Sequence, residues 1–109
     1  MKIIITQNIE SMLNAEIIKA VDIRSKALGR IVEKGEYRKD VHCYAIYAFL
    51  ENNNRVTLGF YKEYKTAQNV LKQLAHWMAY NLDIIPKTYE MPKDEELDKI
   101  AGEHGLILN

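Results

Sequence analysis

The sequence predicts an α+β fold: an antiparallel sheet of about four or five strands, one long helix packed on one face of it, and a short C-terminal helix. Two observations carry this prediction. Residues 41–50 and 55–61 are rich in β-branched and aromatic side chains and flank a short Asn-rich connection, which is typical of a β-hairpin. Residues 62–82 repeat apolar side chains at steps of three and four, as one face of an α-helix does.

Residues 2–7 are β-branched and predict a first, short strand. Residues 17–23 alternate as a strand does, although residues 16–28 also fit helical spacing; we prefer the strand and leave the helix open. Residues 24–40 carry six basic and three acidic side chains and are interrupted by Gly29 and Gly35. This segment predicts a long basic loop or a hairpin tip.

The hairpin is expected to turn through residues 52–54, because Asn tolerates a positive φ better than other non-glycine residues. Such a turn sets Glu51 opposite Arg55 and places Phe60 on the same face as Ile46. A lone Gly59 within the second strand predicts a bulge or close packing against the helix.

The long helix should begin at a Thr66 N-cap or nearer Lys62. Residues 88–91 predict an edge strand, and Pro92 suits the first turn of a short helix whose acidic residues 94–96 favour a helix N-terminus. The last twenty residues carry six acidic and two basic side chains. Residues 92–109 are therefore expected to form an acidic helix and tail.

Length and charge limit the classes of function. The chain has 109 residues, 15 Lys+Arg, 15 Asp+Glu and 48% hydrophobic residues, which fits one soluble domain over residues 1–109. A net charge of zero argues against a general affinity for nucleic acids or membranes. No apolar run is long enough for a signal peptide or a spanning helix, and the single Cys43 cannot form an intrachain disulfide. We expect a cytoplasmic protein with Cys43 as a small core residue.

The strand at 41–50 is apolar on both faces, whereas a strand with one wet face should alternate with polar residues. The long helix can cover only one face. Three alternatives could cover the other: the C-terminal segment 97–108, a second copy of the chain, or single-stranded nucleic acid stacked on Tyr47, Phe49 and Tyr61.

Residues that would carry catalysis or bind a cofactor do not assemble into a recognisable set. His42, His76 and His104 lack the spacing of metal ligands, and the chain has neither a Gly-rich phosphate loop nor a Gly-x-Ser-x-Gly elbow. The sequence therefore predicts a non-enzymatic protein without a cofactor or a metal.

The run at 46–52, the run at 56–61 and the run at 89–96 resemble a group of small uncharacterised proteins of Gram-positive bacteria and their mobile elements. The resemblance covers roughly half of the chain and implies the order hairpin, helix, strand and turn. It brings no activity and no catalytic residues. The group has Gly in the turn where this chain has Asn53, and its connection before the central strand is shorter than residues 24–40.

These observations predict a small interaction module that forms a homodimer through the second sheet face or the C-terminal segment. Its expected partner is a second copy of the chain or another protein, and not a membrane. The expected contact residues are Tyr47, Phe49, Tyr61, Leu97 and Ile100. The alternative is a nucleic-acid-associated protein that contacts phosphates through the basic segment. The candidate phosphate contacts are Arg30, Lys34, Arg38 and Lys39.

Overall fold

The computed structural model describes residues 2–9, 11–33, 36–79, 87–96 and 106–108. These residues form seven strands, a short 3-10 helix and one α-helix. In chain order the elements are β1 (Ile3–Ile5), β2 (Met12–Asn14), η1 (Ala15–Ile17), β3 (Ile18–Glu33), β4 (Glu36–Leu50), β5 (Arg55–Tyr61), α1 (Tyr64–Ala79), β6 (Thr88–Glu90) and β7 (Leu106–Leu108).

The strands divide into two sheets. One has the order β2-β1-β6, with β1 antiparallel to β2 and parallel to β6, and the other has the order β5-β4-β3-β7 and is antiparallel throughout. The α+β class is confirmed, but the predicted single sheet is wrong. The three-residue strands β1, β2 and β6 pair with one another instead of extending the long hairpin.

One core lies between the two sheets and α1. Its helical side is the predicted stripe, with Ala67, Val70, Leu74 and Trp77 all buried. Their partners come from both sheets and are fully or almost fully buried: Ile4, Leu13, Ile46, Ala48, Leu50, Leu58, Tyr61 and Met91. The helix begins at Tyr64, near the earlier of the two predicted starts. Its predicted end near residue 82 lies outside the described residues.

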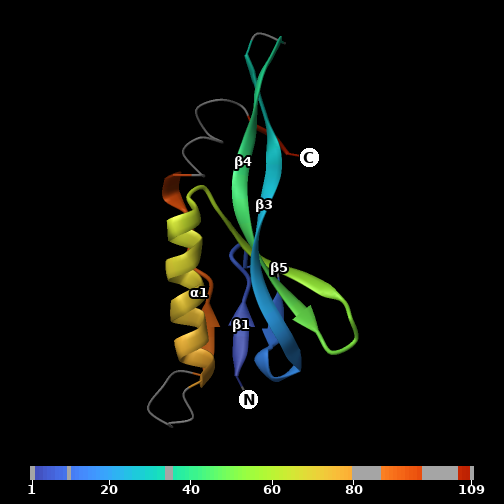
Figure 1. Cartoon of the computed structure of the whole chain (residues 1–109), viewed down its shortest axis with the longest axis vertical. Coiled ribbons are helices and arrows are strands. Elements are labelled where there is room, and N and C mark those ends of the chain that lie inside the picture. The colour runs from blue at the N-terminus through green and yellow to red at the C-terminus, as the bar shows by residue number, and fades with distance from the viewer. Residues whose placement is uncertain (1, 10, 34–35, 80–86, 97–105, 109) are drawn as a thin grey trace.

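The β3–β4 hairpin forms an arm. Its outer part extends past the end of α1 (Figure 1), and the strands pair along their whole length from Ile18↔Leu50 to Glu33↔Glu36. The radius of gyration, 15.5 Å, exceeds the roughly 13 Å of a compact domain of this size. The strand preferred for residues 17–23 is confirmed from Ile18 onward, after the 3-10 helix, and the alternative helix over residues 16–28 is wrong.

Of the two alternatives predicted for residues 24–40, the long loop is wrong for the described part of that segment, because residues 24–33 and 36–40 are strand. The hairpin alternative agrees with the antiparallel pairing of β3 and β4 out to Glu33↔Glu36. Gly29, which suggested an interruption, lies where the strand register shifts between Ala27↔His42 and Gly29↔Val41. An irregularity of this kind accommodates an extra residue without ending the strand. Arg30 pairs with Asp40 farther out.

The C-terminal segment meets the four-stranded sheet at its edge. Strand β7 pairs antiparallel with residues 29–31 of β3. Of the predicted C-terminal helix, only Glu95 and Glu96 are helical among the described residues, and residues 97–105 lie outside them. The described part of the chain therefore shows no short C-terminal helix.

The turn between β4 and β5 changes the predicted strand register. Asn53 has a φ of 68°, its N–H donates to the Leu50 oxygen at 2.9 Å, and the Leu50 N–H donates to the Asn54 oxygen at 2.9 Å. Arg55 therefore pairs with Phe49 instead of lying opposite Glu51. An Asn is well suited to this left-handed conformation.

A bulge in β5 then exchanges the faces of two aromatic residues. The register passes from Thr57↔Tyr47 to Gly59↔Ile46, so Leu58 is the extra residue, which confirms the bulge predicted at Gly59. Beyond it, Phe60 pairs with Ala45 on the second face, and Tyr61 lies in the core. The prediction that Phe60 shares a face with Ile46 is wrong for this reason.

Candidate binding surface

On the second face of the four-stranded sheet, described side chains of β3, β4 and β5 contact one another. Strand β3 pairs Arg24 with Ala45 and Lys26 with Cys43, so these two cations lie on the same face as the buried residues Cys43, Ala45 and Tyr47. Those three buried residues are not part of the core cluster between the sheets.

Each cation on this face lies over an aromatic ring. The Arg55 Cζ is 4.3 Å from the centroid of the Tyr47 ring. The Arg24 Cζ is 5.1 Å from that of Phe49, and the Lys26 Nζ is 5.3 Å from that of Phe60. Separations below about 6 Å are those of cation–π contacts, each stabilising by about 0.5–1 kcal/mol at exposed sites. We call the surface formed by these six residues the cationic face.

This layer explains how a strand that is apolar on both faces is tolerated. Tyr47 is only 4% exposed although it does not belong to the core cluster, and the Arg55 guanidinium lies over its ring. The long stems of Arg and Lys can shield apolar surface while their charged ends meet water. Arg24 and Arg55 remain exposed, and Lys26 is half-buried.

The charge of the face is mostly positive. Asp22 of β3 lies opposite Tyr47 on this face and accepts a hydrogen bond from Arg24 Nε at 3.2 Å, and the Asp94 carboxylate is close enough to Cys43 to contribute to the raised pKa of its thiol. Both side chains of this ion pair are about half exposed, 53% and 41%, so solvent screens it strongly and it contributes little to stability. The three cations therefore present a net positive field to a partner.

The sequence-predicted contact residues separate in the structure. Tyr47 and Phe49 lie on the cationic face, whereas Tyr61 is fully buried in the core and donates its hydroxyl hydrogen to the Pro92 oxygen at 2.7 Å. Leu97 and Ile100 lie outside the described residues.

The candidate phosphate contacts are on the arm. Arg30 belongs to β3, and Arg38 and Lys39 to β4, whereas Lys34 lies outside the described residues.

Sequence reasoning did not select Arg24, Lys26, Arg55 or Phe60 as site residues. For the first two a signal was present, since charged residues at positions 22, 24 and 26 recur with the period of a strand and mark one face. For Arg55 and Phe60 the deciding features were the turn at Asn53 and the bulge at Leu58, which no periodicity records.

The titratable groups in the described residues do not form a catalytic set. Burial raises the pKa of the Cys43 thiol, an effect that the nearby charges of Lys26 and Lys62 only partly offset. Burial also raises the pKa of Tyr61 and of Tyr89. A thiol whose pKa is raised stays protonated and is a poor nucleophile. No group of three or more His, Cys, Asp or Glu within the described ranges could hold a metal ion.

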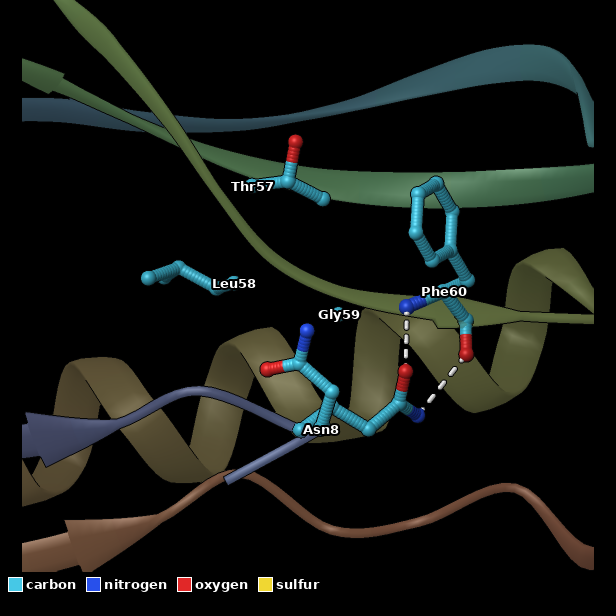
Figure 2. Close-up of a pocket in the computed structure, with 6 residues that line it drawn as sticks. Asn8, Thr57, Leu58, Gly59 and Phe60 are labelled. Carbon is cyan, nitrogen blue, oxygen red and sulfur yellow. Dashed lines mark hydrogen bonds between the residues drawn. The ribbon is translucent and has the colours of Figure 1, made fainter. Parts of the chain in front are cut away.

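A small hollow of about 90 Å³ lies beside β5, lined by Gln7, Asn8 and residues 57–60 (Figure 2). The side-chain amide of Gln7 is hydrogen-bonded to the protein backbone. Its Oε1 accepts a hydrogen bond from the Phe60 N–H at 2.7 Å, and its Nε2 donates to the Phe60 oxygen at 2.9 Å. Small-molecule sites are usually about 300–1,000 Å³. The hollow is smaller than a usual small-molecule site, and the Gln7 side chain that lines it connects the two sheets.

No family model, curated protein or solved structure matches the chain. The resemblance drawn from the sequence stays a prediction. In the part of the chain that the structure describes, no helix is long and apolar enough to cross a membrane.

Proposed function

We propose that the protein is a small, non-enzymatic interaction module that binds an anionic partner through the cationic face. The observation that carries the proposal is the set of three cations, each held over a ring, on a sheet face that lies away from the core. A partner of opposite charge would meet all three at once.

The contacts between cations and rings favour binding in a second way. Long Arg and Lys side chains lose conformational entropy when a partner immobilises them, at about 0.5–1.5 kcal/mol each. A cation that already rests on a ring has lost part of that freedom before binding. Arg24 and Arg55 are restrained in this manner and still exposed.

A net charge of zero is compatible with this proposal because the charges are distributed unevenly. Among the described residues, Arg24, Lys26 and Arg55 share one sheet face, whereas the exposed carboxylates of Glu95 and Glu96 belong to the segment that follows β6. Steering by charge depends on the local field of a surface and not only on the total charge.

Two copies packed through this face would bring the cations of one copy against those of the other, which is unfavourable. We therefore propose a different partner for the cationic face. A homodimer through the C-terminal segment stays a prediction. Light scattering at micromolar concentration tests it, and the mass of a monomer would contradict it.

Retention on immobilised heparin at neutral pH and low ionic strength tests the proposal. The chain should be retained although its net charge is zero, and the double variant Arg24→Gln/Arg55→Gln should elute at clearly lower salt. The matched control is Lys65→Gln/Lys72→Gln, which removes the same charge from exposed positions of α1. If both variants elute alike, total charge and not the cationic face governs retention, and the proposal is wrong.

A further inference from the structure

We infer that the anionic partner is a single-stranded nucleic acid, an inference that rests on the proposed function. The cationic face combines two kinds of group that a single strand uses together. Cations neutralise phosphates, and aromatic rings or guanidinium planes stack on unpaired bases. An acidic peptide would use the cations but would gain nothing from the rings.

The stacking surfaces are spread over the sheet. Arg55 and Phe60 belong to β5, Tyr47 and Phe49 to β4, and Arg24 and Lys26 to β3. Two of the cation–ring pairs join neighbouring strands, and the pair of Lys26 and Phe60 spans from β3 across β4 to β5. Phe49 and Phe60 are half-buried, so each residue keeps part of its surface in solvent. The guanidinium groups of the two arginines lie on rings and belong to exposed residues. A four-stranded sheet whose solvent face offers such groups can stack two or three bases of an extended strand.

The geometry of the face favours a single strand over a duplex. Along β3, Arg24 and Lys26 are separated by one residue, so their Cα atoms lie about 7 Å apart on one face. The contacts are spread over a sheet of paired strands, and an extended, flexible chain can follow such a surface while its bases turn toward the rings. The bases of a duplex are stacked on one another and cannot reach them.

The outer part of the arm carries further basic residues. Arg30 on β3 and both Arg38 and Lys39 on β4 lie farther out on the same hairpin that carries Arg24 and Lys26. Since the phosphate backbone supplies most of the affinity of non-specific binding, the salt dependence of binding tests whether the arm takes part.

Fluorescence anisotropy with labelled oligonucleotides tests this inference. We expect saturable binding of single-stranded RNA or DNA. If only Arg24, Lys26 and Arg55 contact phosphates, the slope of log affinity against log salt should be about −2, from about 0.7 per phosphate neutralised on a single strand. Contacts from the arm would make it steeper.

Ring variants separate stacking from charge. Phe49→Leu and Phe60→Leu keep every cation, so each should weaken binding of the single strand about tenfold, as the loss of one stacked base does, while retention on heparin stays close to that of the wild type. Tyr64→Leu is the matched control, because Tyr64 is an exposed aromatic residue on α1, 48% exposed, away from the face. Unfolding curves show whether each variant folds. If one ring variant does not fold, the other is enough for the test.

Equal affinity for a poly-glutamate peptide, with no effect of the ring variants, would overturn the inference and leave the proposed function intact. Equal or tighter binding of a duplex of the same sequence would overturn the preference for a single strand. Failure to bind any of these probes, together with no retention on heparin, would overturn both proposals.

Discussion

Replacing Gln7 with methionine tests whether one side chain joins the two sheets. Gln7 follows β1 of the three-stranded sheet, and its amide group hydrogen-bonds both backbone groups of Phe60 in the four-stranded sheet. Its Nε2 also donates to the Pro92 oxygen at 3.1 Å, and its own N–H donates to the Leu58 oxygen at 2.9 Å. Methionine has a similar shape and keeps the backbone bond, but it cannot make the three side-chain bonds.

The expected loss follows from those three bonds. A hydrogen bond within a protein contributes about 0.5–1.5 kcal/mol net, so three contribute about 3 kcal/mol. Since Gln7 is half-buried, water can reach part of the site and keep the loss from being larger. A decrease of about 3 kcal/mol is a large share of the 5–15 kcal/mol that typically stabilises a domain.

Urea unfolding followed by tryptophan fluorescence measures the change. Trp77 is the only tryptophan and is 7% exposed, so its emission reports directly on the core. The control is Gln73→Met, the same substitution at an exposed position of α1, which should change stability by less than about 0.5 kcal/mol. If Gln7→Met has no larger effect than this control, Gln7 does not hold the sheets together.

A double-mutant cycle with Tyr61→Phe sharpens the test. The Pro92 oxygen accepts hydrogen bonds from both Tyr61 Oη and Gln7 Nε2, so each single variant leaves it one donor. The double variant removes both donors, and its loss should exceed the sum of the single losses by about 1 kcal/mol. Strict additivity would show that the two bonds are independent.

The remaining predictions concern local strain, packing and ionisation. Ile9 has a φ of 60°, which a β-branched residue adopts only under strain, so Ile9→Asn should raise the free energy of unfolding by about 1 kcal/mol in urea titrations. Ile17→Asn, at another exposed isoleucine, should not, and an equal gain there would rule out strain as the cause. A Cβ added at Gly59 would lie 3.1 Å from the Tyr61 hydroxyl oxygen, so Gly59→Ala should lower the free energy of unfolding by about 1–2 kcal/mol in urea titrations. An unchanged free energy would mean that the Tyr61 ring moves aside without cost. Cys43 is fully buried and burial raises its pKa, so a disulfide reagent should modify it only as fast as the protein unfolds, and rapid modification of the native protein would contradict this. Burial also raises the pKa of Tyr61 above its usual value near 10, so the unfolded chain releases this proton first; the stabilisation is complete below about pH 10 and is lost as the pH rises toward the folded-state pKa. Urea unfolding across that range should show a shallower decline for Tyr61→Phe, and an unchanged slope would assign the decline to other groups.

Patterns that depend on near neighbours in the chain predicted the local elements well. The helical stripe of Ala67, Val70, Leu74 and Trp77 is buried as its spacing indicates, because a helix repeats its faces every few residues whatever surrounds it. The lone Gly59 also indicated the bulge, because a glycine within a strand often marks a local irregularity.

Pairing between distant segments was much harder to predict. The charges and glycines of residues 24–40 suggested a loop, yet these residues pair across the hairpin, where the partner strand satisfies their backbone groups. The three-residue strands β1, β2 and β6 carry too short a pattern to show which sheet they join. In their sheet, β6 pairs with β1 although the paired residues are 85 positions apart in the chain, so the assignment depends on the whole fold.

The cationic face depends both on the order of residues in the sequence and on the register of the folded strands. The order of residues establishes that the strand around Ala45 is apolar on both sides and that charged residues alternate along the preceding strand. It does not establish that those charges cover the second side. The turn at Asn53 moves Arg55 by two positions, from Glu51 to Phe49, and keeps it on the same face. One extra residue at Leu58 then decides that Phe60 lies on the face of Tyr47 and that Tyr61 enters the core. Because side chains on a strand alternate with a period of two, a shift of one residue reverses every face beyond it, and only the folded register determines that shift.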